Sequence, residues 1–355
     1  MHERPQSGFI AFLTRLWWAI NIFRRLVMAG VAFFIVLLMG LMLAAIGGSV
    51  PQVPASAALV LDPVGEVVEQ LSGDATDRAI AKLLDDERPE VLLRDLVDAI
   101  RAAKDDARIK ALVLDLGEMS AIGPSKLADL KGALEDFKAS GKKVVAVGDG
   151  YDRNQYYLAA QADEIHLHPL GMVILDGYGR FGTFYKEGID RFEVDWHVFR
   201  VGEYKSAVEP YVRSDMSPEA REANLEWLGD IWRDYLADVG AGRKLTPEAL
   251  STGIDSLVEQ LEASGGDTAR LAVEAGLVDQ LSTREQVRDR LKELVGGDEE
   301  GDSFNQIGLE DYLAALGESR PGRSESDAGN VGVIVASGTI LDGSQEPGTI
   351  GGDST

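Results

Sequence analysis

One lysine stands out among the residues whose chemistry could serve catalysis. Lys205 lies in the segment FRVGEYKSAVEPYVRSDMSPEAREA, residues 199–223, between a predicted strand and a predicted helix. Apolar neighbours such as Val208 can bury part of its side chain and so favour the neutral amine, which acts as a general base. Glu203 and Glu209 would oppose this if their carboxylates approached the amine, so they must point away. From the spacing alone, an ordinary solvated lysine is the favoured interpretation, and the general base is the alternative.

The other reactive residue types give weaker signals. His166 and His168 share one face of a predicted strand and can be two metal ligands, but no third ligand accompanies them, so paired strand positions are the plainer interpretation. Ser140 and Lys143 match the pattern SxxK, yet the glycine between them looks like a helix end. The glycines around Gly177 lack the strand-loop-helix context of a dinucleotide site, and no GxSxG elbow occurs. We therefore predict neither a cofactor nor a metal.

Composition narrows the function further. The chain has 355 residues, of which 45% are hydrophobic, enough to bury a full core. Its 59 acidic residues outnumber its 35 Lys and Arg and give a net charge of −24, which argues against nucleic acid as a partner. The absence of cysteine removes disulfides, thiolate zinc sites and cysteine nucleophiles.

The amino-terminal residues predict a membrane anchor. The uncharged run LVMAGVAFFIVLLMGLMLAAI, residues 26–46, is long enough at about 1.5 Å per residue to cross a hydrocarbon core of about 30 Å. Arginines dominate residues 1–25, so the positive-inside rule places that tail in the cytoplasm and the rest of the chain on the other side. A cleavable signal ending at Ala57 is the alternative, but the apolar run exceeds that of a signal peptide. Residues 47–57 read as a spacer.

The elements that would position Lys205 belong to an α/β domain over residues 58–295. Apolar runs typical of buried strands alternate with helical patterns, which predicts a largely parallel sheet. A long helix capped by Ser217 carries an aromatic stripe, Trp227, Trp232 and Tyr235, that can face the core or a neighbouring subunit. The strands are expected at 58–61, 109–116, 143–147, 164–168 and 194–201.

The last part of the chain predicts a linker and the start of a second copy of the domain. Residues 296–330 are rich in Gly, Ser and acids around a short predicted helix, as in linkers. Residues 331–355 begin with an expected strand at 331–336, and VGVIVASGTIL at 331–341 echoes ALVLDPVGEVV at 58–68. Since a lone strand cannot bury itself, we expect the natural chain to continue past Thr355.

Several of these segments together resemble the signal peptide peptidase A family, peptidase family S49, in its long two-repeat form. The resemblance covers the amino-terminal span, AIRAAKDDARIKALVLDL at 99–116, GKKVVAVGDGYDRNQYYLAAQADEIHLHP at 141–169, the highly specific YKSAVEP block, and VGVIVASGTILDG at 331–343. It implies a Clp protease/crotonase-like repeat, an α/β fold, behind one amino-terminal transmembrane helix.

The resemblance also implies how the catalytic residues are divided. In this family the amino-terminal repeat provides a lysine general base, which corresponds to Lys205, and the carboxy-terminal repeat provides a serine nucleophile. The nucleophile segment has the form AASGGYW in the family, and Arg153 occupies the serine position here. An arginine cannot attack a carbonyl, so the nucleophile is expected outside this chain, which by itself should be inactive.

The implied activity is that of a serine endopeptidase with a Ser/Lys dyad that degrades cleaved signal peptides. Its implied partners are signal-peptide remnants and other apolar peptides, and its place is the bacterial inner membrane with the catalytic part in the periplasm, as a homotetramer. The alternative is a membrane-tethered scaffold without catalysis. Acyl-CoA chemistry, by analogy with crotonases, is disfavoured because an external domain would not meet CoA.

Overall fold

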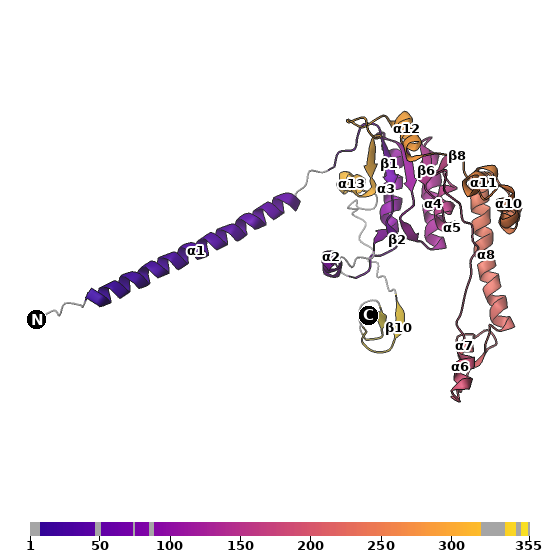
Figure 1. Cartoon of the computed structure of the whole chain (residues 1–355), viewed down its shortest axis with the longest axis horizontal. Helices are drawn as coiled ribbons and strands as arrows, with labels where there is room; N and C mark the ends of the chain where they lie inside the picture. Colours follow the sequence, from indigo (N-terminus) through magenta and orange to yellow (C-terminus); the bar gives the residue numbers. More distant parts are fainter. Residues whose placement is uncertain are drawn as a thin grey trace, which may run out of the picture. The chain divides into compact units, whose positions relative to one another are not determined.

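The structure is a computed structural model that describes residues 8–46, 51–73, 75–84, 89–320, 338–345 and 349–353. These residues fall into two compact units that divide after Pro51. The first unit is helix α1, Gly8–Ile46, in which Phe12–Gly40 is long and apolar enough to cross a membrane (Figure 1). The predicted span at 26–46 lies within this helix, which begins earlier than the uncharged run. The apolar side chains described in α1 are exposed, as expected where no protein surface covers them.

A six-stranded parallel sheet forms the centre of the second unit. Its strand order is β8-β7-β6-β4-β1-β9, and every neighbouring pair is parallel. This confirms the predicted α/β class and four of the five predicted strands. The bounds are β1 Ala57–Leu61, β4 Ile109–Asp115, β6 Lys143–Gly148, β7 Glu164–Leu167, β8 Gln280–Leu281 and β9 Gln306–Gly308.

Helices cover both faces of this sheet, which explains why its strands read as continuous apolar runs. In β4, Ala111 and Val113 pack against α12, Arg284–Val295. The alternate residues Leu112 and Leu114 face the larger core, where burial of each leucine contributes about 1.5–3 kcal/mol. Helices of that core include α3 Leu93–Asp105, α4 Pro124–Lys138 and α5 Arg153–Ala159.

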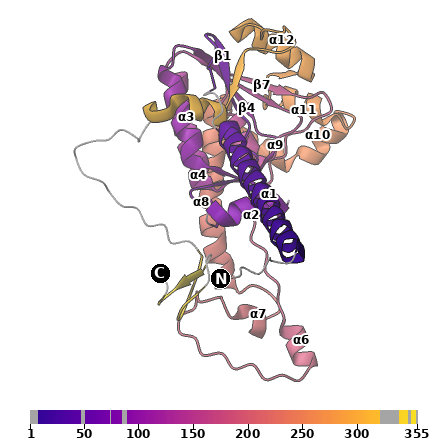
Figure 2. The same cartoon turned by 90° about the vertical axis from the view of Figure 1, so that its left-hand side faces the viewer.

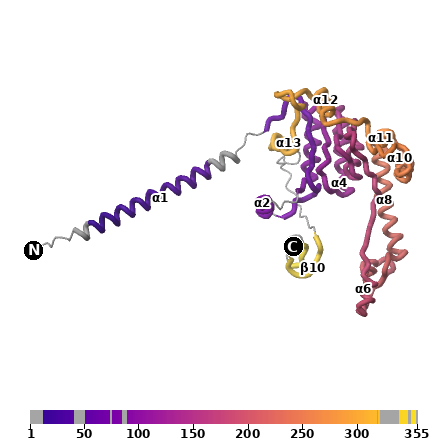
Figure 3. Tube along the Cα trace, in the orientation of Figure 1, coloured from indigo at the N-terminus to yellow at the C-terminus, as the bar shows by residue number. Residues whose placement is uncertain are grey.

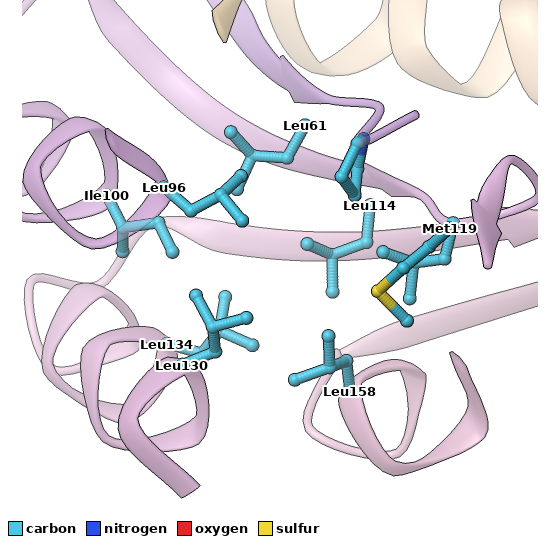
Figure 4. A pocket seen from close by; sticks show the side chains of 10 residues that line it. Leu61, Leu96, Ile100, Leu114, Met119, Leu130, Leu134 and Leu158 are labelled. Atoms are coloured by element: carbon cyan, nitrogen blue, oxygen red, sulfur yellow. The ribbon is translucent and has the colours of Figure 1, made fainter. Parts of the chain in front are cut away.

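One small apolar gap remains in this core. It has a volume of about 20 Å³, near the minimum for one water molecule, and its wall is formed by ten apolar residues, eight of which Figure 4 labels. An apolar lining offers water no hydrogen bonds, so the gap belongs to the packing of the core and is not a ligand site.

The remaining elements lie around the sheet. A second parallel sheet has the order β3-β2-β5, and β10 and β11 form a separate parallel pair. Their bounds are β2 Gly65–Val68, β3 Glu90–Leu92, β5 Met119–Ala121, β10 Thr339–Leu341 and β11 Thr349–Gly351; the other helices are α2 Ala75–Leu84, α9 Pro247–Asp255, α10 Leu257–Ala263, α11 Thr268–Glu274 and the 3₁₀ turn Gly317–Ser319.

The prediction of a linker over residues 296–330 is wrong for the first half of that stretch. Within it, β9 pairs with β1, and α13, Leu309–Leu316, packs against α3 and β1. Leu309 and Tyr312 are buried there, because a short apolar helix can cover an open sheet edge. The domain therefore extends at least through α13. The strand expected at 331–336 lies outside the described residues.

Residues 176–230 form an arm that leaves the sheet and returns to it. The chain runs out from Asp176 through α6, Lys186–Arg191, and α7, Glu209–Val212, and comes back along the first half of α8, Pro218–Arg243. Figures 1 and 2 place α6 and α7 beyond the end of the sheet, near the amino-terminal end of α8, and Figure 3 traces the arm out to α6.

The strand predicted at 194–201 is wrong, because these residues are exposed and have no strand assignment. Phe199 is 98% exposed. A strand needs a neighbour for its backbone groups, and the described residues offer none at this end of the arm.

Candidate active site

Lys205 lies in a turn near the far end of the arm, just before α7. The turn is made by Gly202, whose φ of +111° favours glycine, and the Lys205 amide donates to the Gly202 carbonyl at 3.4 Å. The side chain of Lys205 is exposed, as in the solvated interpretation that the spacing favours, and its sequence neighbours do not bury it in this chain. Nearness in sequence does not place Val208 over the amine, because the turn directs the lysine into solvent.

The main chain of this turn is held by a buried acid and an arginine. Arg200 Nη1 donates to the Lys205 carbonyl at 2.8 Å and lies 3.7 Å from Oε1 of Glu209. Glu209 is 2% exposed, and its Oε2 accepts a hydrogen bond from the Ser217 amide at 3.1 Å. Burial would raise the pKa of Glu209, but hydrogen bonds from Ser217 and nearby arginine charge outweigh it and lower the pKa. These contacts favour the charged form of Glu209, which binds the Ser217 amide, while Arg200 holds the backbone of the turn.

Neither glutamate of the segment neutralises the lysine. In the described part of the chain, Lys205 forms no ion pair with Glu203 or Glu209, and the Glu209 carboxylate is engaged with Ser217 and Arg200. Among the described residues, therefore, the contacts of Glu209 are with Arg200 and Ser217 and not with Lys205.

Helix α8 starts where the sequence places it, which fixes the far end of the arm. Ser217 Oγ accepts from the Ala220 amide at 3.1 Å, and Pro218 occupies the first turn. Because Ser217 also donates its own amide to Glu209, which lies 3.7 Å from Arg200, one chain of contacts links the cap of α8 to the Lys205 turn.

Arg153 lies in the first turn of α5, after Asp152 caps that helix. Its Nη1 donates to the carbonyls of Gly177 at 2.6 Å and Asp176 at 3.2 Å, and its guanidinium lies 4.1 Å from the ring centre of Tyr178. The hydroxyl of Tyr235 on α8 donates to the Arg153 carbonyl at 2.9 Å. A large cation fixed to a loop thus fills the position that the family resemblance gives to the nucleophile.

The other residues singled out by type have structural partners. Buried His166 lies with Nδ1 2.9 Å from Ser282 Oγ and 3.0 Å from Gln280 Nε2, and burial lowers its pKa. His168 Nδ1 accepts from the Leu170 amide at 3.2 Å. Among the residues described, no group of three or more His, Cys, Asp and Glu is placed to hold a metal ion.

The SxxK pair is likewise separated by its surroundings. The Ser140 hydroxyl donates to the Phe137 carbonyl at 2.6 Å and so completes the end of α4. Lys143 begins β6 with an exposed side chain. These contacts belong to a helix end and a strand start, as the glycine between them indicated.

The sequence singled out Trp232 and Tyr235 but missed Tyr178, which joins them where the arm meets the domain. Trp232 and Tyr235 stack at 5.0 Å between ring centres, and Tyr178 meets Tyr235 edge-on at 6.5 Å. This part of the aromatic stripe packs within the chain, whereas Trp227 remains 43% exposed. No spacing rule could pair Arg153 with Tyr178, because the two are distant in sequence and meet only in the fold.

The comparisons with known proteins agree on a family. Residues 136–297 match Peptidase family S49. The chain is 38% identical to Protease 4 of Salmonella typhi over 98% of its own length and 56% of the relative's, and 35% identical to Protease 4 of Haemophilus influenzae over 81% and 45%. It therefore spans about half the length of these curated relatives.

Among solved structures, an enoyl-CoA hydratase/isomerase from Marinobacter aquaeolei matches 57% of this chain and 64% of its own chain, at 15% identity and a TM-score of 0.27. The match to Protease 4 extends over nearly the whole described chain and includes both the Lys205 turn and the arm that carries it. The chain thus carries a peptidase family S49 region over residues 136–297 and is similar to Protease 4 along almost its whole length.

Proposed function

We propose that this chain is the base-bearing part of a membrane-anchored serine peptidase. The observation that carries the proposal is the Lys205 turn: its main chain is fixed by Arg200 and Glu209, while its amine is exposed at the end of an arm. A fixed backbone with a free amine suits a residue that completes a site together with another surface. The names and family of the relatives support a serine peptidase.

In the proposed reaction, the neutral amine of Lys205 takes the proton from the hydroxyl of a serine that residues 1–355 do not provide. The serine oxygen attacks the peptide carbonyl carbon, the C–N bond breaks, and the proton passes to the leaving amine. Water then attacks the acyl-enzyme ester and releases the peptide acid and the serine. Arg153 takes no covalent part, since its guanidinium is bound to carbonyls and is not a nucleophile.

The exposed apolar surface of the arm supports the need for a second surface. Phe181, Phe199 and Val201 are 97%, 98% and 86% exposed on the segment that leads to Lys205. A surface that covers them would also remove water from the amine, which favours its neutral form. The carboxy-terminal repeat implied by the family resemblance is the proposed source of both this surface and the serine.

The proposed substrates are signal-peptide remnants and other apolar peptides at a bacterial inner membrane. Helix α1 supports tethering, because Phe12–Gly40 has the length and apolar character of a span. Arginines at its amino-terminal side favour a cytoplasmic tail and a periplasmic catalytic part. A homotetramer is proposed from the family resemblance.

The test replaces Lys205 by Met and by Arg in the full-length protein. Loss of a general base should lower kcat/KM on a fluorogenic apolar peptide by about 10²–10⁴-fold, and should abolish labelling by a serine-reactive phosphonate. Lys186→Met is the matched control, since Lys186 is a lysine of the same arm paired with Asp190. Retained cleavage by both Lys205 variants would overturn the base assignment. A wild-type protein that neither cleaves nor labels would favour the scaffold.

A further inference from the structure

We infer that Arg153 is a positioning residue for Lys205, acting as a clamp at the root of the arm. The inference rests on the proposed function, because it gives Arg153 a purpose only if the place of Lys205 matters. Its evidence is separate from that function: it comes from the contacts by which Arg153 holds both the outgoing and the returning segment of the arm.

The outgoing segment is held by the guanidinium. Arg153 Nη1 binds the carbonyls of Asp176 and Gly177, and the planar group lies over the ring of Tyr178. These three consecutive residues are where the chain leaves the domain. Charge-assisted hydrogen bonds are shorter and stronger than neutral ones, and a cation is attracted to the face of an aromatic ring.

The returning segment is held by the backbone of the same residue. Tyr235, which is 2% exposed on α8, donates its hydroxyl to the Arg153 carbonyl at 2.9 Å. The rings of Tyr178 and Tyr235 also touch edge-on, so the two segments meet each other at this point. One residue of α5 therefore joins both segments of the arm to the sheet domain.

Arginine is an unexpected choice for the first turn of a helix, where the macrodipole disfavours a cation. Its side chain is only 20% exposed, and its Nε is buried without a hydrogen-bond partner. The macrodipole, the partial burial and the unpaired Nε all disfavour an arginine at position 153. The contacts of Arg153 with the arm must offset these costs. Lysine could not reproduce these contacts, because it lacks the planar group that stacks on Tyr178 and donates along one edge.

Because α8 is long, a small change of angle at the clamp causes a large displacement of the Lys205 turn. Tyr235 lies eighteen positions after Ser217 along α8, which corresponds to about 27 Å at 1.5 Å per residue. A tilt of about 5° at the root would move the far end by roughly 2 Å over that length. Ser217 is bound to Glu209, and through Arg200 to the Lys205 turn, so the turn moves with the end of the helix. A misplacement of about 1 Å can cost about a hundredfold in rate.

The outgoing segment also contacts α8, so a movement of α8 at the root of the arm carries the outgoing segment with it. Arg180 Nη1 donates to Asn224 Oδ1 at 3.1 Å, and the Tyr204 hydroxyl donates to Glu222 Oε2 at 3.3 Å. The arm thus moves as one body, and its direction is set where Arg153 holds it.

The test compares Arg153→Ala, Arg153→Lys and Tyr235→Phe in the full-length protein, with Arg233→Ala as control. Arg233 is an arginine of α8 with a side chain 73% exposed, so its loss removes the same charge without touching the root. We expect kcat to fall about 10- to 100-fold for both Arg153 variants and less for Tyr235→Phe, with KM nearly unchanged. The control should keep wild-type kcat.

A distance measurement separates this inference from the proposed function. Spin labels at Asp129→Cys on α4 and Glu187→Cys on α6 report the direction of the arm, and residues 1–355 add no background cysteine. Pulsed electron resonance should give a broader or shifted distance distribution in the Arg153 variants than in wild type or Arg233→Ala. An unchanged distribution in both Arg153 variants would overturn the inference, whatever the activity. If the distribution broadens while Lys205→Met retains activity, the clamp stands and the proposed function fails.

Discussion

The buried carboxylate of Glu209 offers the sharpest test of how the Lys205 turn is built. Glu209→Ala removes the acceptor of the Ser217 amide and the acid opposite Arg200, while leaving the sheet domain untouched. Glu209→Gln keeps the shape and one acceptor oxygen but loses the charge. The exposed neighbour Glu203 provides the matched control as Glu203→Gln.

The size of the effect follows from what is left behind. Ser217 is 3% exposed, so its amide loses its partner in a place that water reaches poorly. Leaving a buried donor unsatisfied costs about 1–3 kcal/mol. At about 1.4 kcal/mol per factor of ten, local opening of the α8 amino terminus should increase roughly 5- to 150-fold in Glu209→Ala. Glu209→Gln should lie at the lower end, because a neutral hydrogen bond replaces a charged one.

Hydrogen exchange of the backbone amides measures this opening directly. Exchange should accelerate over residues 209–224 and stay at the wild-type rate in β4 and β6, which are not part of the arm. Equal protection of 209–224 in wild type and Glu209→Ala would refute the claim that this acid fixes the turn. Acceleration in Glu203→Gln as well would mean that net charge, and not the buried contact, controls the segment.

Two further predictions concern the domain itself. The pKa of His166 is lowered from its ordinary value of 6.5 by burial, with Glu164 opposing that shift, so the unfolded state binds its proton first and the free energy of unfolding should fall as pH drops below 6.5. Thermal unfolding across pH 5–8 checks this, and the slope should shrink in His166→Gln but not in His168→Gln. A Cβ at Gly242 would lie 2.3 Å from the Ala160 carbonyl, so Gly242→Ala should destabilise by about 1–3 kcal/mol. Gly229→Ala on the same helix meets nothing within 4 Å and should stabilise by about 0.5–1 kcal/mol in urea unfolding.

Much of the fold could be predicted from the sequence, because buried parallel strands leave a strong apolar signal. IKALVLD and KVVAVG appear as strands β4 and β6, and the cap at Ser217 starts α8. Strand β9 escaped because only Ile307 of its three residues is buried, and its partner β1 lies at the other end of the domain. From local composition alone, such a short edge strand is predicted to be part of a linker.

The site was predictable in its residue types and not in its surroundings. Lys205 was singled out from its neighbours in sequence. Its burial, however, depends on which surface covers the turn, and the side chains next to it in sequence do not cover it. The opposite holds for Glu209, which an acidic, loop-like segment would suggest is solvated, yet it is buried. Neither the exposure of Lys205 nor the burial of Glu209 can be read from the sequence, because each depends on contacts with α8 or with another surface.

The place of β1 in the sheet has a consequence for synthesis. Its two neighbours, β4 and β9, come from opposite ends of the domain, and β9 is translated roughly 250 residues after β1. At about 5–20 residues per second, a ribosome needs on the order of 12–50 s to reach it. During that interval one side of β1 has unpaired backbone groups that other chains can bind. A nascent chain of this protein thus passes through a period of aggregation risk that ends only when β9 and α13 have been made.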